Sequence, residues 1–365
     1  MQPPKPATPP HRVPALDGLR GLAVLLVIAY HYSGQAHLFF PGWAGVDLFF
    51  VLSGYLITQR LNATKGRPHY FSHFYRNRAV RILPLYYTLV LAFLLAIDLF
   101  VSAKNLPTLQ FYPQHWKSFL IFTQNWTFAR FGTPTDLSLV PLWSIAVEVQ
   151  FYLCWPTLIY LVPNPKFSVK LFPILLLLVL LARSIFYLTH PASEYQVYFN
   201  SFFRMDGFLL GSLLCQIHQA RITISAKLIK YGMAILLLIF ATVAFLTKNT
   251  TPFNPFYSTI GYTLVAVFFT GLLHLVSQPA TNALDIFFNH NFLRHCGRIS
   301  YCLYLIHFPF LYVAYSRTLA LAPAWWPSHL FLYRTTAICS ALLLSFLLST
   351  LSFRYFESRF LRLKK

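Results

Sequence analysis

Long apolar runs separated by short polar segments make up most of this chain of 365 residues. A helix needs about 20 mostly apolar residues to cross the hydrocarbon core of a bilayer. Runs that approach this length lie near residues 16–34, 43–59, 82–101, 142–161, 169–189, 202–217, 228–247, 256–276, 299–315 and 330–352. The pattern therefore predicts an all-α polytopic membrane protein, a bundle of about ten transmembrane helices.

Composition supports this prediction. Hydrophobic residues make up 57% of the chain and charged residues 10%, and the mean hydropathy is +0.56. A soluble protein carries about a quarter charged residues. The formal net charge of +20 could indicate nucleic-acid binding, but the basic residues form short clusters between apolar runs rather than one solvated face. We therefore expect membrane lipids around the protein and no nucleic-acid partner.

The basic residues also predict the orientation of the chain. With a cytoplasmic N-terminus, 20 of the 29 Lys and Arg fall in cytoplasmic segments and five in outside loops, as the positive-inside rule requires. Both termini are therefore expected in the cytoplasm. We expect a disordered cytoplasmic N-terminus over residues 1–12, a membrane domain over 13–357 and a basic cytoplasmic tail over 358–365. The longest outside loop, about 102–141, could form an interfacial helix and a lid over an outward-facing site.

Two polar side chains share the first apolar run. His31 follows Arg20 by eleven positions, which is about three helical turns, so both lie on one helix face about 16 Å apart along the axis. Burying a cation and an imidazole in a bilayer is costly, so such residues face protein or water and are functional candidates. The spacing predicts that this helix supplies half of an active site that extends through the bilayer.

Further polar residues lie in or beside the apolar runs. The predicted topology places Arg20, Arg78 and Arg81 near the cytoplasmic face and His307 near the middle. It places the following residues in the outer half of the membrane: His31, Asp47, Glu148, Arg204 and Asp206.

The two groups suggest different chemistry. Arg78 and Arg81 are neighbours on one helix face, a geometry that suits phosphate oxygens, although ordinary positive-inside anchoring explains such a pair equally well. Near the outer face, Glu148 or Asp47 could orient the His31 imidazole so that its other nitrogen removes a proton from a hydroxyl. The alternative for this group is a set of polar contacts that only hold helices together.

Six motifs in order give the chain a resemblance to the acyltransferase-3 family of integral membrane O-acyltransferases, over the range from Leu16 to Glu357. They are LDGLRG at 16–21 followed by His31, GVDLFFVLSGYLI at 45–57, RAVRILPLY at 78–86, LWSIAVE at 142–148, RMDG at 204–207 and GRISYCLYLIH at 297–307.

This resemblance implies transfer of an acyl group, most often acetyl, from cytoplasmic acyl-coenzyme A to a hydroxyl of a carbohydrate. The acceptor would be a cell-surface polysaccharide, a lipopolysaccharide or a lipid-linked glycan, and the location a bacterial inner (plasma) membrane. The resemblance implies a catalytic His31, as general base or acyl relay, with Arg20 as its partner in the motif. Arg78 and Arg81 would hold the coenzyme A phosphates.

We assign the candidate site residues on this basis. The expected catalytic residues are His31, Glu148 and Asp47. The expected coenzyme-binding residues are Arg20, Arg78 and Arg81. The expected acceptor-binding residues are Trp143, Ser144, Arg204, Asp206, Tyr301 and His307. Acyl-coenzyme A is the expected co-substrate, and no metal is expected.

Two departures from the family pattern affect the details. Val149 follows Glu148 where many relatives have a second glutamate. Many relatives also carry a soluble esterase-like domain after the membrane domain, so here we expect the membrane domain, or a separate periplasmic or extracellular protein, to handle the acceptor. The alternative function is a transporter or flippase for lipid-linked glycans, although the sequence has no visible inverted repeat.

Overall fold

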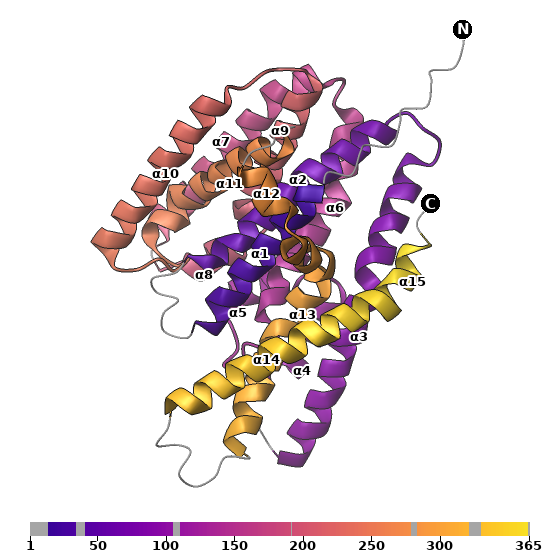
Figure 1. The fold of residues 1–365 in the computed structure, drawn as a ribbon, viewed down its shortest axis with the longest axis vertical. Helices are drawn as coiled ribbons and strands as arrows, with labels where there is room; N and C mark the ends of the chain where they lie inside the picture. Colours follow the sequence, from indigo (N-terminus) through magenta and orange to yellow (C-terminus); the bar gives the residue numbers. More distant parts are fainter. Residues whose placement is uncertain are drawn as a thin grey trace.

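A computed structural model describes residues 14–33, 41–104, 110–190, 192–278, 283–320 and 330–363. The expected disordered segment 1–12 and the last two residues of the expected tail lie outside these ranges. The described residues form helices joined by turns and contain no strand (Figure 1). The expectation of an all-α protein is confirmed.

The helices fall into three stretches of the chain. The first contains α1 (Pro14–Tyr32), α2 (Gly45–Thr64), α3 (Tyr70–Lys104), α4 (Phe111–Leu120) and α5 (Gln124–Phe131). The second contains α6 (Trp143–Leu161), α7 (Pro165–Thr189), α8 (Glu194–Phe199), α9 (Asp206–Gln219) and α10 (Ala226–Thr247). The third contains α11 (Tyr262–Ser277), α12 (Ala283–Asn289), α13 (Asn291–Ala320), α14 (Leu330–Ser352) and α15 (Ser358–Leu361).

Seven helical segments among the described residues are long and apolar enough to cross a membrane. They are Pro14–Tyr32, Tyr70–Ala96, Val140–Leu161, Pro165–Thr189, Ala226–Thr247, Tyr257–Ser277 and Arg334–Leu361. A helix also lies at each of the other three predicted ranges, namely α2, α9 and α13. With 14 residues, α9 is shorter than a full crossing requires. The protein is an integral membrane protein, while the total of ten spans and the orientation of the termini stay predictions.

Close backbone contacts hold α1 against α13 and α2 against α9. A Cβ on Gly297 of α13 would lie 1.8 Å from the Asp17 carbonyl oxygen of α1, and one on Gly54 of α2 would lie 2.2 Å from the Phe208 carbonyl oxygen of α9. Only glycine permits this approach, and small residues allow helices to pack closely in membranes. These crossings fix how α1, α2 and α13 present their polar residues to the centre of the protein.

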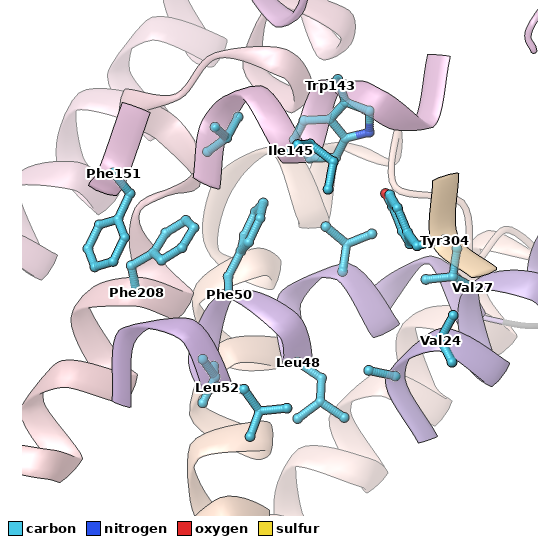
Figure 2. Packing of buried hydrophobic residues seen from close by; sticks show 14 of the residues in the cluster. Val24, Val27, Leu48, Phe50, Leu52, Trp143, Ile145, Phe151, Phe208 and Tyr304 are labelled. Atoms are coloured by element: carbon cyan, nitrogen blue, oxygen red, sulfur yellow. The ribbon is translucent and has the colours of Figure 1, made fainter. Parts of the chain in front are cut away.

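The core between α2, α6 and α9 is aromatic. Phe208 of α9 stacks on Phe50 of α2 at a ring-centroid distance of 4.4 Å and on Phe151 of α6 at 4.2 Å. Figure 2 shows these three rings side by side, with Trp143 and Tyr304 further along the same layer. In contrast, α10 lies at the edge of the bundle with almost no buried residues (Figure 1). An apolar helix with so little burial is suited to lipid contact.

Candidate active site

Two cavities meet near the centre of the protein. The first, which we call the basic cavity, is lined by residues that include Arg20, Arg78, Arg81, Ser144, Glu148, Tyr152 and Tyr301. The second, which we call the histidine cavity, is lined by residues that include Tyr30, His31, Trp43, Trp143, Tyr195, Tyr198 and Phe308. Val46 and Tyr304 line both cavities, so these two side chains form a shared wall.

Three arginines line the basic cavity. Arg20 comes from α1, and Arg78 and Arg81 come from adjacent turns of α3. The Arg78 guanidinium lies 5.7 Å from the centre of the Tyr152 ring, and its buried Nε has no hydrogen-bond partner within the part of the chain that the structure describes. Cations gathered around a cavity with unused donors favour a multiply charged anion such as phosphate, which arginine binds through charge-assisted hydrogen bonds.

Glu148 of α6 lines the basic cavity and is held by two hydroxyl groups. Ser53 of α2 and Tyr152, one turn further along α6, both donate to Glu148 Oε1. Glu148 therefore adds an acidic side chain to the cavity that the three arginines line. Sequence reasoning did not single out Ser53 or Tyr152. For Tyr152 a signal was available, because its hydroxyl group follows Glu148 by one helical turn within an apolar run.

Hydroxyl groups lie at the shared wall. The Tyr304 hydroxyl of α13 is 2.7 Å from Ser144 Oγ and donates to the Pro141 carbonyl oxygen at 2.9 Å. Ser144 is also one of the residues around the basic cavity. Figure 2 shows the Tyr304 ring between α1, which carries Val27, and the helix that begins at Trp143. The boundary between the cavities therefore carries the Ser144 and Tyr304 hydroxyls.

His31 of α1 contacts a second histidine. Its Nδ1 lies 2.8 Å from Nε2 of His307 on α13, and the ring centroids are 5.0 Å apart. His307 is fully buried, and its Nδ1 lies 2.7 Å from the Tyr304 carbonyl oxygen. The Tyr32 hydroxyl donates to the His307 carbonyl oxygen at 2.7 Å. His31, in contrast, lines the histidine cavity.

Three other predicted site residues belong to a buried ionic network. Arg204 Nη2 lies 2.8 Å from Asp47 Oδ1, and Arg183 Nη1 lies 2.5 Å from Asp206 Oδ2. The Arg204 guanidinium also lies 3.9 Å from the centre of the Tyr262 ring. As far as the described residues define the two cavities, Asp47, Arg204 and Asp206 are not among their lining residues.

Arg183 was missed by sequence reasoning, although it is a cation in the interior of the apolar run 169–189, 13 positions after Lys170, and no part of its side chain is exposed. It donates to Asp206, to the Phe203 carbonyl oxygen at 2.7 Å and to Thr263 Oγ1 at 2.7 Å. A buried arginine with this many partners ties α7 to α9 and α11. A charged residue in an apolar run is the signal that could have identified it.

The structure thus divides the predicted site residues into three groups. The basic cavity brings together Arg20, Arg78, Arg81, Ser144, Glu148 and Tyr301. His31 and Trp143 line the histidine cavity, and His307 contacts His31. Asp47, Arg204 and Asp206 form the ionic network. Within the described part of the chain, no three His, Cys, Asp or Glu side chains gather as they would around a metal ion.

Comparison with known proteins gives consistent relatives. The chain is 31% identical over 366 residues to the peptidoglycan O-acetyltransferase OatA of Listeria monocytogenes, covering 95% of this chain and 55% of that protein. It is 31% identical over 319 residues to the putative peptidoglycan O-acetyltransferase YrhL of Bacillus subtilis, covering 82% and 49%. With the O-acetyltransferase OatA of Staphylococcus aureus it shares 28% identity over 322 residues, covering 83% and 51%.

The chain spans about half the length of these relatives. No solved structure matches it. The model of a family described as an acyltransferase domain matches residues 13–350, nearly the whole chain. The protein therefore belongs to the acyltransferase-3 family.

Proposed function

We propose that this protein is a membrane O-acyltransferase that moves an acetyl group from cytoplasmic acetyl-coenzyme A to a hydroxyl of a cell-envelope glycan. Family membership supports the class of reaction. The observation that carries the proposal is that a cavity lined by three arginines and a cavity lined by His31 share the wall formed by Val46 and Tyr304. A donor held on one side can then meet an acceptor held on the other.

The basic cavity suits the donor. Coenzyme A carries several phosphate oxygens, and each guanidinium of Arg20, Arg78 and Arg81 offers planar donors for them. The unpartnered Nε of Arg78 supports an anion as the ligand. Apolar side chains of α2, including Phe49, Leu52 and Leu56, line the same cavity and would accompany the acyl arm toward the wall.

The histidine cavity suits a sugar acceptor. Aromatic side chains line it, among them Tyr30, Trp43, Trp143, Tyr195 and Tyr198. Flat aromatic rings stack on sugar rings while His31 meets a hydroxyl. The names of two relatives specify peptidoglycan, which makes a glycan of the cell envelope the first acceptor to test.

In the proposed reaction, His31 acts as general base at the wall. It removes the proton from the acceptor hydroxyl as the oxygen attacks the thioester carbonyl carbon. The new C–O bond forms, the C–S bond breaks, and the protonated His31 returns the proton to the leaving thiolate. The Tyr304 hydroxyl, which donates to the Pro141 carbonyl oxygen in this structure, would exchange that acceptor for the thioester carbonyl oxygen as negative charge develops there.

An acyl-histidine relay is the variant of this mechanism. The His31 imidazole would attack the thioester first, and the acceptor hydroxyl would then take the acyl group from the imidazole. Rapid quenching of a reaction with radiolabelled acetyl-coenzyme A in the absence of acceptor separates the two routes. If the wild-type protein becomes labelled and the His31→Gln variant does not, the relay is indicated. If the wild-type protein carries no label, direct transfer is indicated.

The proposed topology has ten transmembrane helices with both termini in the cytoplasm of a bacterial inner membrane. Helices at all ten predicted ranges support it, although α9 by itself is shorter than a full crossing, and so does the clustering of basic residues. Arg67→Cys and Lys248→Cys variants, made one at a time, should be labelled from opposite sides by a maleimide that does not cross membranes. The test needs a background in which the exposed Cys154 and Cys339 are replaced by alanine.

Thiol release by the purified protein in nanodiscs tests the function. Wild type should release free coenzyme A from acetyl-coenzyme A when cell-envelope glycan is present. His31→Gln should abolish release, and Arg78→Ala should weaken it. Arg76→Ala is the matched control, because Arg76 is exposed on the same helix two residues away. Glycan movement between leaflets without thiol release would instead support the flippase.

A further inference from the structure

We infer that His307 is a positioning residue that holds His31 in the tautomer whose Nε2 carries the basic lone pair. This inference rests on the proposed function of His31 as a base. It follows from three observations: the acceptor opposite His307 Nδ1, the burial of His307, and the contact between the two imidazoles.

The first step concerns the proton on His307. Its Nδ1 lies 2.7 Å from the Tyr304 carbonyl oxygen. A carbonyl oxygen accepts hydrogen bonds and cannot donate one, so the contact requires a proton on His307 Nδ1. Without that proton, two lone pairs would face each other at hydrogen-bond distance.

The second step concerns the charge on His307. Its side chain is fully buried, and its ring is hydrogen-bonded to His31 and to the backbone of Tyr304 and Leu303, none of which is an anion. A buried cation without an anionic partner is strongly disfavoured. His307 is therefore neutral, and since its single proton is on Nδ1, its Nε2 carries a lone pair.

The third step transfers this constraint to His31. The His307 Nε2 lone pair lies 2.8 Å from His31 Nδ1, so His31 Nδ1 must donate. A neutral His31 then has its one proton on Nδ1 and its lone pair on Nε2. The ring lines the histidine cavity, whereas His307 does not. The basic nitrogen of His31 is thus Nε2, because Nδ1 is the nitrogen that contacts His307.

This arrangement supplies what a carboxylate supplies in other histidine-based sites, without a buried negative charge. Such a carboxylate selects the tautomer and orients the ring. When His31 accepts the substrate proton on Nε2, its Nδ1–H becomes a charged donor, and its hydrogen bond to His307 becomes stronger. A chain of hydrogen bonds then runs from the Tyr304 carbonyl oxygen through the His307 ring to His31.

The tautomer can be read directly by solid-state nitrogen-15 NMR of the protein labelled at histidine, in nanodiscs at neutral pH. The signals of His31 are those that disappear in His31→Gln. The inference expects a protonated Nδ1 and an unprotonated Nε2 for His31. An unprotonated Nδ1 with a protonated Nε2 would overturn it, and this measurement needs no change at position 307.

Two substitutions at position 307 test the consequence for catalysis. His307→Gln offers a carbonyl oxygen near the position of Nε2, whereas His307→Leu fills similar space without an acceptor. His307→Leu should lower kcat by about 100-fold, in the range of general-base effects, with KM for acetyl-coenzyme A unchanged. His307→Gln should recover most of that loss. Equal loss in both variants together with a raised KM would show a merely structural residue and overturn the inference.

A second histidine pair, in which His274 is buried and His218 is half-buried, provides the control. His218 Nε2 lies 2.9 Å from His274 Nδ1, and neither residue lines the basic or the histidine cavity as defined by the described residues. His274→Leu should leave thiol release near the wild-type rate.

The outcomes for the proposed function are separate from those for this inference. A wild type that transfers no acetyl group, or a His31→Gln variant that remains active, contradicts the function. An active wild type and an inactive His31→Gln, combined with a fully active His307→Leu, contradict the role of His307 alone.

Discussion

His31 Nδ1 and His307 Nε2 lie 2.8 Å apart although 276 positions separate the two residues in the sequence. The contact exists because α1 and α13 cross with their backbones nearly touching at Gly297 and Asp17. The same two helices contribute Arg20 to the basic cavity and Tyr304 to the shared wall. The crossing of α1 and α13 is therefore the structural basis of the candidate site.

Gly297→Ala should disrupt this crossing. The added Cβ would lie 1.8 Å from the Asp17 carbonyl oxygen, so the helices must move apart. Forcing a methyl group into a packed interface costs about 1–3 kcal/mol. We expect a lower melting temperature in detergent, followed by scanning fluorimetry, and reduced thiol release. Gly232→Ala on α10 is the control, because nothing lies within 4 Å of its added Cβ. A Gly297→Ala protein as stable as this control would contradict the packing argument.

Arg78→Ala should weaken binding of the donor through its phosphates. Loss of one charge-assisted hydrogen bond costs about 1.5–3 kcal/mol, so KM for acetyl-coenzyme A should rise by about 10-fold or more with a smaller change in kcat. Acetyl-dephospho-coenzyme A, which lacks one phosphate, completes a double-mutant cycle with each of Arg20, Arg78 and Arg81. The arginine that contacts the missing phosphate should show a smaller loss with this donor. Purely additive losses for all three would contradict contact with the 3′-phosphate, which is the group that the dephospho donor lacks.

Val46→Ala should leave more space at the wall that the two cavities share. Val46 lines both of them, so a smaller side chain leaves room for a longer acyl group. One methylene in an apolar pocket changes selectivity by about 10-fold or more. The ratio of propionyl to acetyl transfer, measured as kcat/KM, should therefore rise by several-fold.

Val51→Ala is the control for this experiment. Val51 is buried on the same helix but is not among the residues that line either cavity as described. It should lose comparable stability and keep the wild-type selectivity. The same shift in both variants would mean that loosened packing, rather than the shared wall, sets the acyl length.

Asp47→Asn should destabilise the protein more than it slows the chemistry. Asp47 pairs with Arg204 in a fully buried contact of 2.8 Å, and removing one partner of a buried ion pair costs about 3–5 kcal/mol. Thermal unfolding should shift strongly downward, while the protein that remains folded keeps its KM for acetyl-coenzyme A. A double variant, Asp47→Leu with Arg204→Met, should recover part of the stability because no lone charge remains.

The same variant tests the sequence-based hypothesis that Asp47 is catalytic. A normally stable Asp47→Asn protein with a large loss of kcat would support a catalytic carboxylate and contradict a purely structural ion pair.

The sequence by itself determined the local features of this protein. Apolar runs of bilayer length placed a helix at each predicted range, because each such run must satisfy its backbone hydrogen bonds internally. Helical periodicity likewise put Arg78 and Arg81 on neighbouring positions of α3, and both line the basic cavity. The same periodicity set Arg20 and His31 three turns apart, a separation that assigns one residue to each cavity.

Only the tertiary structure decided which residues meet across helices. It paired His31 with His307, Asp47 with Arg204, and Glu148 with Ser53 and Tyr152. Periodicity specifies a face within one helix, whereas the partner of that face depends on how each helix is rotated and how closely the glycines allow neighbours to approach. The division of the polar residues into two cavities and one ionic network arises from that packing.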